Sequence, residues 1–273
     1  CIRDRGIASV VPVVESMGRA MLGTPLLSST LAGQLALRAG GEERWGSLLA
    51  EIAAGTPATV ALLESADWGD EVIRVELTAD GTLAGTKDFV TDAGVARHFV
   101  VVAQRGGEPV IAHVTRDQVA DSAISEHTLI DQTKRSARID FSGITVADEQ
   151  LLTGDAVAPA LRDLRLLGAL LVAAEATGTA AACLDTTVEY LKTRKQFGKL
   201  IGSYQALKHP SVDVLCQMDS SRSFIYHAAT LVTDAALDRD AEIACRMAKA
   251  QATEALLYAG DRAVQFHGGM GFT

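Results

Sequence analysis

The chain has 273 residues, 48% of them hydrophobic, and a formal net charge of -9. The apolar fraction supports substantial cores and excludes a disordered chain. The acidic balance and the absence of a Lys/Arg tract argue against a nucleic-acid partner, because phosphate neutralisation needs clustered cations. The longest apolar run, Leu166–Ala174, is followed by Glu175 and is short for a membrane span, so we expect no membrane-spanning segment.

The four cysteines are scattered along the chain and fit neither a metal site nor a disulfide framework. We expect no metal, and buried thiols in a reducing, cytoplasmic environment; the four are Cys1, Cys183, Cys216 and Cys245. The sequence begins inside a helical pattern and stops on a glycine-rich loop, so we expect residues to be missing at both ends. No signal peptide is visible, although a truncated start would hide one.

The first zone, residues 1–64, is predicted to be helical. Apolar residues recur at helical spacing, and Ala and Leu dominate, in Val11–Met21, Thr30–Ala39 and Glu42–Ala54.

The second zone, residues 65–153, changes to short alternating runs separated by turn residues. Arg105–Glu108 contains two glycines and predicts a hairpin turn. The predicted strands are Val72–Leu77, Leu83–Val90, His98–Gln104, Pro109–Val114, Ser136–Phe141 and Ile144–Val146. Several short strands without intervening helices predict an antiparallel sandwich or barrel.

The third zone, residues 154–273, is helical again and resembles a bundle that buries wide apolar faces. Pro159 suits a first helical turn, and Gly268 suits a residue that ends a helix in a left-handed conformation. The predicted helices run to about Arg194, from an N-cap at Ser203 to about Leu237, and from about Asp240 to Phe266. The fold class is therefore α+β and multidomain: an N-terminal helical domain, a central antiparallel β-barrel or sandwich, and a C-terminal helical bundle.

Two segments of the third zone carry the most specific pattern. Residues 193–209 read TRKQFGKLIGSYQALKH, and residues 265–273 read QFHGGMGFT. Together, in this order and with a helical spacer between them, they resemble the flavin-binding segments of the acyl-CoA dehydrogenase family. The helix–strand–helix order of the zones is also that of this family.

The resemblance implies FAD as the cofactor. A guanidinium at Arg194 and the start of the following helix suit its pyrophosphate. Phe197 would pack against adenine or ribose, and Gln196 and Gln205 would bind polar edges. Without the resemblance, a charged helix end and an ordinary turn would explain this corner.

In the family, the loop that matches Gln265, Gly268 and Gly269 receives the adenosine diphosphate part of an FAD bound mainly by a neighbouring subunit. The resemblance therefore implies a dimer or tetramer, homomeric or heteromeric, with FAD at the interface. It also implies an acyl-CoA substrate and an electron-transferring flavoprotein as acceptor. The alternative for the glycines is a helix stop signal. His267 is expected to be a packing residue rather than an acid or base.

The strand zone holds a third match, residues 85–94 with the sequence GTKDFVTDAG. It resembles the family strand that lies against the flavin ring, with Phe89 covering the isoalloxazine and Thr91 reaching its N5 edge. A plain strand and turn is the alternative. Residues 62–68 fall where relatives have a Thr-Glu-Pro and Gly-Ser-Asp segment that contacts flavin and acyl-CoA. That pattern is largely lost here, so the resemblance does not identify the substrate site.

The family reaction removes a C2 proton and a C3 hydride from an acyl-CoA thioester, leaving a 2-enoyl-CoA, and needs a carboxylate base. One family position for this base lies past Thr273. The other falls at about Gly168 and Ala169, which cannot act as bases. Glu175 is nearby but matches poorly, so the catalytic residue is unknown.

Three hypotheses follow from this pattern. The first is an FAD-dependent acyl-CoA dehydrogenase of fatty acid β-oxidation or lipid metabolism, or a close flavin-dependent relative. The second is a non-catalytic partner subunit that shares an FAD site in a heteromeric assembly. The third, a helical scaffold that has lost flavin, is disfavoured by the retained motif residues.

Overall fold

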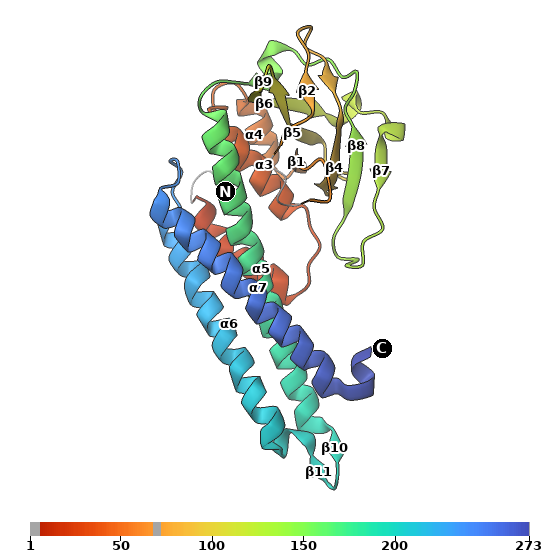
Figure 1. Cartoon of the computed structure of the whole chain (residues 1–273), viewed down its shortest axis with the longest axis vertical. Helices are drawn as coiled ribbons and strands as arrows, with labels where there is room; N and C mark the ends of the chain where they lie inside the picture. The colour runs from red at the N-terminus through yellow and green to blue at the C-terminus, as the bar shows by residue number, and fades with distance from the viewer. Residues whose placement is uncertain (1–5, 68–71, 273) are drawn as a thin grey trace. The chain divides into compact units, whose positions relative to one another are not determined.

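The computed structural model describes residues 6–67 and 72–272 and shows a chain of two compact units (Figure 1). The first unit spans Gly23–Arg165, and the second joins residues 6–22 to residues 166–272. The helix–strand–helix order along the chain is the predicted one. The three domain ranges 1–64, 65–153 and 154–273 stay a prediction.

The first unit contains two helices, the start of a third, and two β-sheets. The helices are α3 (Leu26–Arg38), α4 (Gly46–Ala53) and the first turns of α5 (Val157–Thr193). A six-stranded sheet contains β1 (Ala58–Ala61), β2 (Glu76–Leu77), β3 (Leu83–Ala84), β5 (His98–Arg105), β6 (Glu108–Thr115) and β9 (Leu151–Leu152). A three-stranded sheet contains β4 (Thr86–Thr91), β8 (Ser136–Asp140) and β7 (Ile124–Glu126), with β8 in the centre.

Strand β5 shows how these layers pack, because its residues are buried on both faces. Phe99 and Val101 belong to a core that they share with Val90 and Ile139 of the three-stranded sheet. Val100 belongs to a second core with residues of α3 and α4. The six-stranded sheet is therefore covered by the other sheet on one face and by helices on the other, which explains the unbroken apolar run in β5.

The sheets differ from the predicted antiparallel barrel or sandwich. The described strands form no closed barrel, and both β1 and β2 pair with β5 in parallel. The helical pattern predicted for residues 1–64 does not hold at its end, because β1 lies at Ala58–Ala61. Its pairing of Ala58 with His98 joins residues 40 positions apart, and a four-residue strand gives too little local pattern to reveal it.

Other predicted strands are shorter or absent. The segment predicted over Ile144–Val146 makes only an isolated bridge at Thr145, and only Glu76–Leu77 of the first predicted strand is regular. The hairpin turn at Arg105–Glu108 is confirmed, with Gly106 and Gly107 at positive φ between paired residues.

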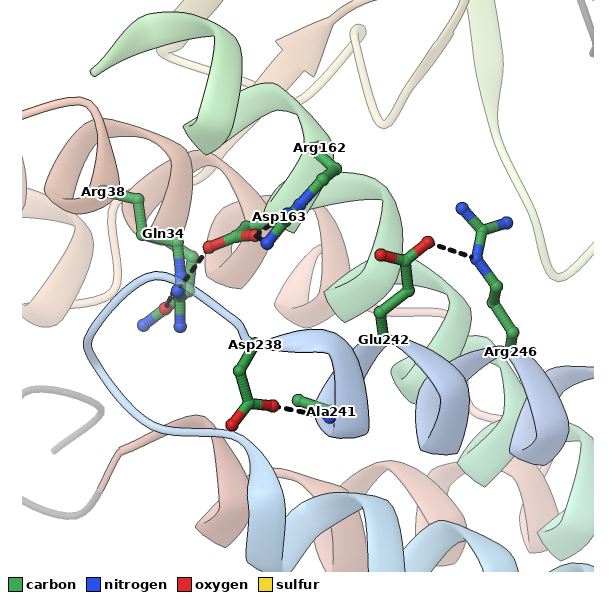
Figure 2. A network of polar contacts seen from close by, with 8 residues as sticks. All are labelled: Gln34, Arg38, Arg162, Asp163, Asp238, Ala241, Glu242 and Arg246. Atoms are coloured by element: carbon green, nitrogen blue, oxygen red, sulfur yellow. Dashed lines mark hydrogen bonds and ion pairs between the residues drawn. The ribbon is translucent and has the colours of Figure 1, made fainter. Parts of the chain in front are cut away.

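A buried ion pair joins α3 to the start of α5 inside the first unit (Figure 2). Arg38 Nη1 lies 2.9 Å from Asp163 Oδ2, and the two side chains are 3% and 2% exposed. Arg162 also donates to Asp163, at 3.0 Å. Because an unpaired charge at this depth would be costly, the pair fixes the register of the two helices.

The second unit is a helical bundle of α2 (Val11–Arg19), the remainder of α5, α6 (Gln205–Leu231) and α7 (Arg239–His267). Helix α2 crosses α5 in backbone contact. A Cβ added at Gly18 would lie 2.0 Å from the Glu175 carbonyl oxygen, and one at Gly178 would lie 1.8 Å from that of Glu15. Only glycine permits this approach, so both residues are required by packing.

Helix α5 is long and apolar enough to cross a membrane by length and composition alone, contrary to the expectation from its sequence. More than half of its most apolar window, 56%, is buried inside the protein. The buried core helix of a bundle can be equally long and apolar, so packing inside the bundle accounts for the composition of α5.

The helix boundaries in the bundle differ from the predicted ones at two places. Ser203 does not cap α6: it lies in a 3₁₀ turn, Ile201–Ser203, where its hydroxyl donates to the Leu200 carbonyl at 2.7 Å. Helix α6 ends at Leu231 instead of about Leu237, and Val232 after it is extended, with φ -76° and ψ 119°. Asp238 then caps α7, accepting the Ala241 N–H at 2.9 Å (Figure 2).

The thiols also differ in part from the expectation. Cys245 is buried, and burial raises the pKa of the Cys183 thiol. Cys216 is exposed on α6, and Cys1 lies outside the described residues. In the described part of the chain no group of three or more His, Cys, Asp or Glu side chains is arranged to hold a metal ion.

A chain of three titratable groups crosses the helical face of the six-stranded sheet. His98 Nε2 lies 3.0 Å from Glu51 Oε2, and its Nδ1 lies 3.1 Å from His113 Nε2. Burial, with a smaller contribution from the charge on His98, lowers the pKa of His113 to about 4. His113 is therefore neutral at neutral pH and packs against the Trp45 ring, with centroids 5.7 Å apart.

We expect stability to fall with pH because of His113. Its folded-state pKa of about 4 lies below the ordinary value of 6.5, so between these values the unfolded chain binds more protons than the folded one. Stability is then fully present above pH 6.5 and is lost as the pH falls towards 4, by up to about 3 kcal/mol. Urea unfolding at pH 7.5, 5.5 and 4.5 measures this loss. His113→Gln should flatten it, whereas the control His227→Gln, at an exposed position on α6, should leave it unchanged; equal slopes for all three proteins would contradict the assignment.

Candidate cofactor-binding site

The corner between α5 and α6 is a β-hairpin that the sequence pattern did not predict. Strands β10 (Lys195–Gln196) and β11 (Lys199–Leu200) pair antiparallel around a two-residue turn. The turn residues are Phe197 at φ 53° and Gly198 at φ 77°. Positive φ at both positions is the type I′ geometry, which favours Asn, Asp or Gly at the first of them.

Phe197 is therefore an unfavourable residue for its position. A bulky aromatic residue with positive φ is strained, and this ring is 90% exposed. Neither its conformation nor its exposure stabilises the isolated chain. Such strain gathers at ligand-binding positions, so the geometry supports a ligand contact for Phe197.

Arg194 is held by its backbone and leaves its side chain available. Its N–H donates to the Tyr190 carbonyl at 3.0 Å, and its own carbonyl accepts from Ile201 at 2.9 Å. The exposed guanidinium forms no ion pair with another residue in the described part of the chain. An available guanidinium in a chain of net charge -9 is suited to bind an anion.

Gln196 and Gln205 lie on either side of this corner, and both are exposed. Gln205 is the first residue of α6, whose opening N–H groups lack partners within the helix and favour negative charge. The Tyr204 hydroxyl donates to the Gln196 carbonyl at 3.4 Å and ties the hairpin to the start of α6. The structure thus brings Arg194, Gln196, Phe197 and Gln205 to one corner, as predicted.

The C-terminal segment ends α7 where the sequence predicts. Gln265 is exposed on the last turn, and Gly268 follows at φ 60° and ψ -135°. The φ is positive as predicted, although the ψ lies outside the left-handed helical region. Gly269 is exposed at the start of a 3₁₀ turn, Gly268–Phe272, and a Cβ there would meet nothing within 4 Å.

One ring contact joins the end of α5, just before the first motif segment, to the second motif segment. Tyr190, one turn before Arg194, stacks on His267 with ring centroids 4.3 Å apart. His267 Nδ1 lies 2.7 Å from the Ala263 carbonyl, an acceptor, so this nitrogen carries a proton and donates it. His267 therefore has packing and helix-end contacts, in agreement with its predicted structural role.

Phe89 and Thr91 form a separate group on β4 in the first unit. Phe89 has φ 49° and lies in a β-bulge, where the pairing of β4 with β8 shifts between Lys87 and Val90. Thr91 is exposed at the end of the strand, and its carbonyl accepts from the Thr59 hydroxyl at 2.6 Å. The described residues with positive φ other than glycine are Met21, Phe89, Asp92 and Phe197, so two of the four are predicted cofactor contacts.

The strand carries a buried ion pair that the sequence pattern did not reveal. Lys87 is fully buried, and its ammonium lies 2.5 Å from Glu64 Oε1 and 3.1 Å from the Leu62 carbonyl. The Glu64 carboxylate also accepts the N–H groups of Arg74 and Val75. Burial lowers the pKa of Lys87, and the bond to Glu64 opposes this shift. The sequence does contain one signal for this pair, a lysine within an otherwise apolar strand pattern, because lysine is almost never fully buried without a partner.

This pair changes the interpretation of residues 62–68. The segment lacks the family pattern, but Glu64 within it is structurally engaged, so the segment contributes to the packing of β4. Trp68 lies outside the described residues.

No carboxylate lies at the second family position for the base. Gly168 and Ala169 are half-buried on α5, and Glu175 follows Gly168 by seven residues, about 10 Å along a helix. The Glu175 carbonyl accepts from Thr179 and touches the α2 crossing. The arrangement therefore offers anion, aromatic and glycine contacts for a dinucleotide, without a base on this part of α5.

Comparisons with known proteins show which family the chain resembles. The sequence model of the family described as "Acyl-CoA dehydrogenase, C-terminal domain" matches residues 166–273. The chain is 33% identical to the acyl-CoA dehydrogenase IpdE2 of Mycobacterium tuberculosis over 98% of its own length and 68% of that protein. It is 26% identical to subunit CarC of the caffeyl-CoA reductase-Etf complex of Acetobacterium woodii, over 97% of this chain and 70% of that one. Its structure resembles that of the ChsE4-ChsE5 complex of Mycobacterium tuberculosis with a TM-score of 0.82 at 26% identity, covering 99% of this chain and 72% of that chain.

The two loop glycines should respond differently to substitution. Gly268→Ala places a side chain at φ 60° and should destabilise the end of α7 by about 1 kcal/mol or more. Gly269→Ala is the matched control, because its position has room and no positive φ. Amide hydrogen exchange over residues 264–272 measures the difference; equal protection in the two variants would show that backbone conformation does not constrain this loop.

Proposed function

The chain belongs to the acyl-CoA dehydrogenase family, whose members are FAD-dependent oxidoreductases acting on acyl-CoA, and we propose that it takes part in the α,β-dehydrogenation of an acyl-CoA thioester to a 2-enoyl-CoA. FAD, when bound, accepts the hydride. The strain at Phe89 and Phe197 carries the proposal, because both predicted aromatic contacts adopt a costly backbone conformation.

In this proposal Arg194 binds the pyrophosphate of FAD. Its guanidinium is exposed, and the N-terminus of α6 follows eleven residues later. A guanidinium and a helix N-terminus together suit the two negative charges of a pyrophosphate. Gln196, Phe197 and Gln205 bind other parts of the dinucleotide at the same corner. Phe89 covers the isoalloxazine and Thr91 reaches its N5 edge.

The glycine loop has a separate part in the proposal. Gln265, Gly268 and Gly269 receive the adenosine diphosphate part of an FAD held by a neighbouring subunit, so the working protein is an oligomer with FAD at its interface. The similarity to a subunit of the caffeyl-CoA reductase-Etf complex supports an electron-transferring flavoprotein as acceptor. A role in fatty acid or other lipid oxidation and a cytoplasmic location stay predictions.

A second candidate function is a non-catalytic partner subunit in a heteromeric acyl-CoA dehydrogenase. Gly168 and Ala169 favour it, because this part of α5 supplies no carboxylate. The similarity to the ChsE4-ChsE5 complex, which contains two kinds of chain, also favours it. In this arrangement the chain contributes Arg194 and the glycine loop at Gly268 and Gly269 to a shared FAD site, and the other chain supplies the base.

An absorbance spectrum of the full-length protein, before and after anaerobic addition of acyl-CoA, tests the proposal. A flavin band that bleaches with the chain purified alone would establish a self-sufficient dehydrogenase. A band that bleaches only after a partner chain is added would establish the shared site. No flavin in either preparation would contradict both candidates.

Arg194→Ala should weaken FAD binding. Loss of charge-assisted hydrogen bonds of about 1.5–3 kcal/mol corresponds to roughly ten- to a hundredfold weaker binding. Flavin content after gel filtration, and titration of the apoprotein with FAD, measure the effect. The control is Arg246→Ala, an exposed arginine on α7 that pairs with Glu242 (Figure 2). Normal flavin occupancy in Arg194→Ala would remove the pyrophosphate assignment.

A further inference from the structure

The conformation of Phe89 needs an explanation within the first unit. Its φ of 49° is strained for an aromatic residue, and the β-bulge leaves Asp88 and Phe89 outside the regular pairing of β4 with β8. A strained residue keeps its conformation only where the surrounding contacts determine it. The contacts of Asp88 and His127 meet this requirement.

Asp88 holds the backbone of the bulge. Its carboxylate Oδ1 accepts the Phe89 N–H at 2.9 Å, and its own N–H donates to the Leu63 carbonyl at 2.7 Å. The same Oδ1 lies 3.1 Å from His127 Nε2. One carboxylate oxygen therefore binds both the strained backbone and the ring that packs beside it.

His127 holds the side chain of Phe89. The two rings have centroids 5.0 Å apart and planes tilted by 46°, within the range of favourable aromatic pairs. His127 directly follows β7 in the three-stranded sheet, in which β4 and β7 flank β8 (Figure 1). Its backbone N–H donates to the Ser136 carbonyl at 2.9 Å, so the sheet itself places the imidazole.

The contacts of His127 extend to the neighbourhood of Thr91. His127 Nδ1 lies 3.3 Å from the Ser136 hydroxyl, and Ser136 pairs directly across the strands with Thr91. Directly opposite residues of an antiparallel pair project from the same face. With Nε2 beside the Asp88 carboxylate and Nδ1 beside the Ser136 hydroxyl, contacts at both ring nitrogens fix the orientation of the imidazole.

We propose that His127 and Asp88 are positioning residues that fix Phe89, and with it the face carrying Thr91, for contact with the flavin ring. The inference rests on the proposed function, because it takes from it that Phe89 covers the isoalloxazine. It assigns to His127 a role in aligning the flavin, without contact between His127 and the reacting atoms.

The test compares variants of the FAD-loaded protein, together with its partner chain if flavin binding requires one. Phe89→Leu, His127→Ala and the double variant are compared for the visible absorbance spectrum of bound FAD and for the rate of its anaerobic reduction by acyl-CoA. We expect the two single variants to shift the spectrum alike and to slow reduction about fivefold or more, the effect of releasing roughly 1 kcal/mol or more of positioning strain. The double variant should show no further change, because both substitutions remove one interaction.

Two further variants test the ring contact with Phe89 and the Asp88–His127 bond separately, and a third variant controls for a general loss of structure. His127→Phe keeps the ring contact and should restore part of the spectrum, and Asp88→Asn keeps the shape of the side chain while weakening its bond to His127. The control is His113→Ala, another half-buried histidine of the first unit with an aromatic neighbour, on the other sheet. It should leave the flavin spectrum unchanged.

The outcomes separate a failure of the positioning role of His127 and Asp88 from a failure of the proposed placement of Phe89 on the flavin. If Phe89→Leu alters the flavin spectrum and His127→Ala and Asp88→Asn do not, the positioning role is overturned while the placement of Phe89 stands. If Phe89→Leu leaves the spectrum unchanged, the placement of Phe89 fails and the inference fails with it. Should His127→Ala not fold, Asp88→Asn carries the same comparison.

Discussion

The buried ion pair between Lys87 and Glu64 is the constraint on which the strand part of the site depends. An ammonium group with no exposed surface must be paired, since removing a lone charge from water is far more costly than any packing gain. Glu64 meets this need and also accepts two backbone N–H groups. The pair therefore fixes residues 62–64 against β4 immediately before the bulge that contains Phe89.

The two aromatic residues assigned to the cofactor share a physical property that their sequence contexts do not. Phe89 lies in a bulge of one compact unit and Phe197 in a hairpin turn of the other, and both have φ near 50°. Strain of this kind lowers the stability of the chain, so a packing explanation alone is insufficient. A ligand contact at each ring, taken separately, would explain why an aromatic residue occupies a backbone position that favours glycine or asparagine.

In the bundle unit, the contacts beneath the two motif segments include ring stacking and close helix packing. Tyr190 stacks on His267, and glycines allow α2 to cross α5 in backbone contact. Arg194 follows Tyr190 by one turn and keeps its guanidinium exposed. Rigid packing beneath an available cation is the arrangement that an anion site needs, because little freedom remains to be lost on binding.

The sequence alone predicts the order of helices and strands, the β5–β6 hairpin and the end of α7 beside Gly268. It also predicts that Arg194, Gln196, Phe197 and Gln205 gather at one corner, and their contact with flavin stays a prediction. These features depend on local chemistry: Gly106 and Gly107 permit a tight turn, and Gly268 permits a positive φ. The β10–β11 hairpin is local, but Phe197 is not a residue that signals a type I′ turn, so its sequence does not reveal it. Folding alone brings β1 beside β5, Lys87 against Glu64, and His127 onto Phe89. Pairings between strands and side chains that lie tens of residues apart leave no period in the sequence, because the free energy that selects them comes from burial and hydrogen bonding in the folded chain.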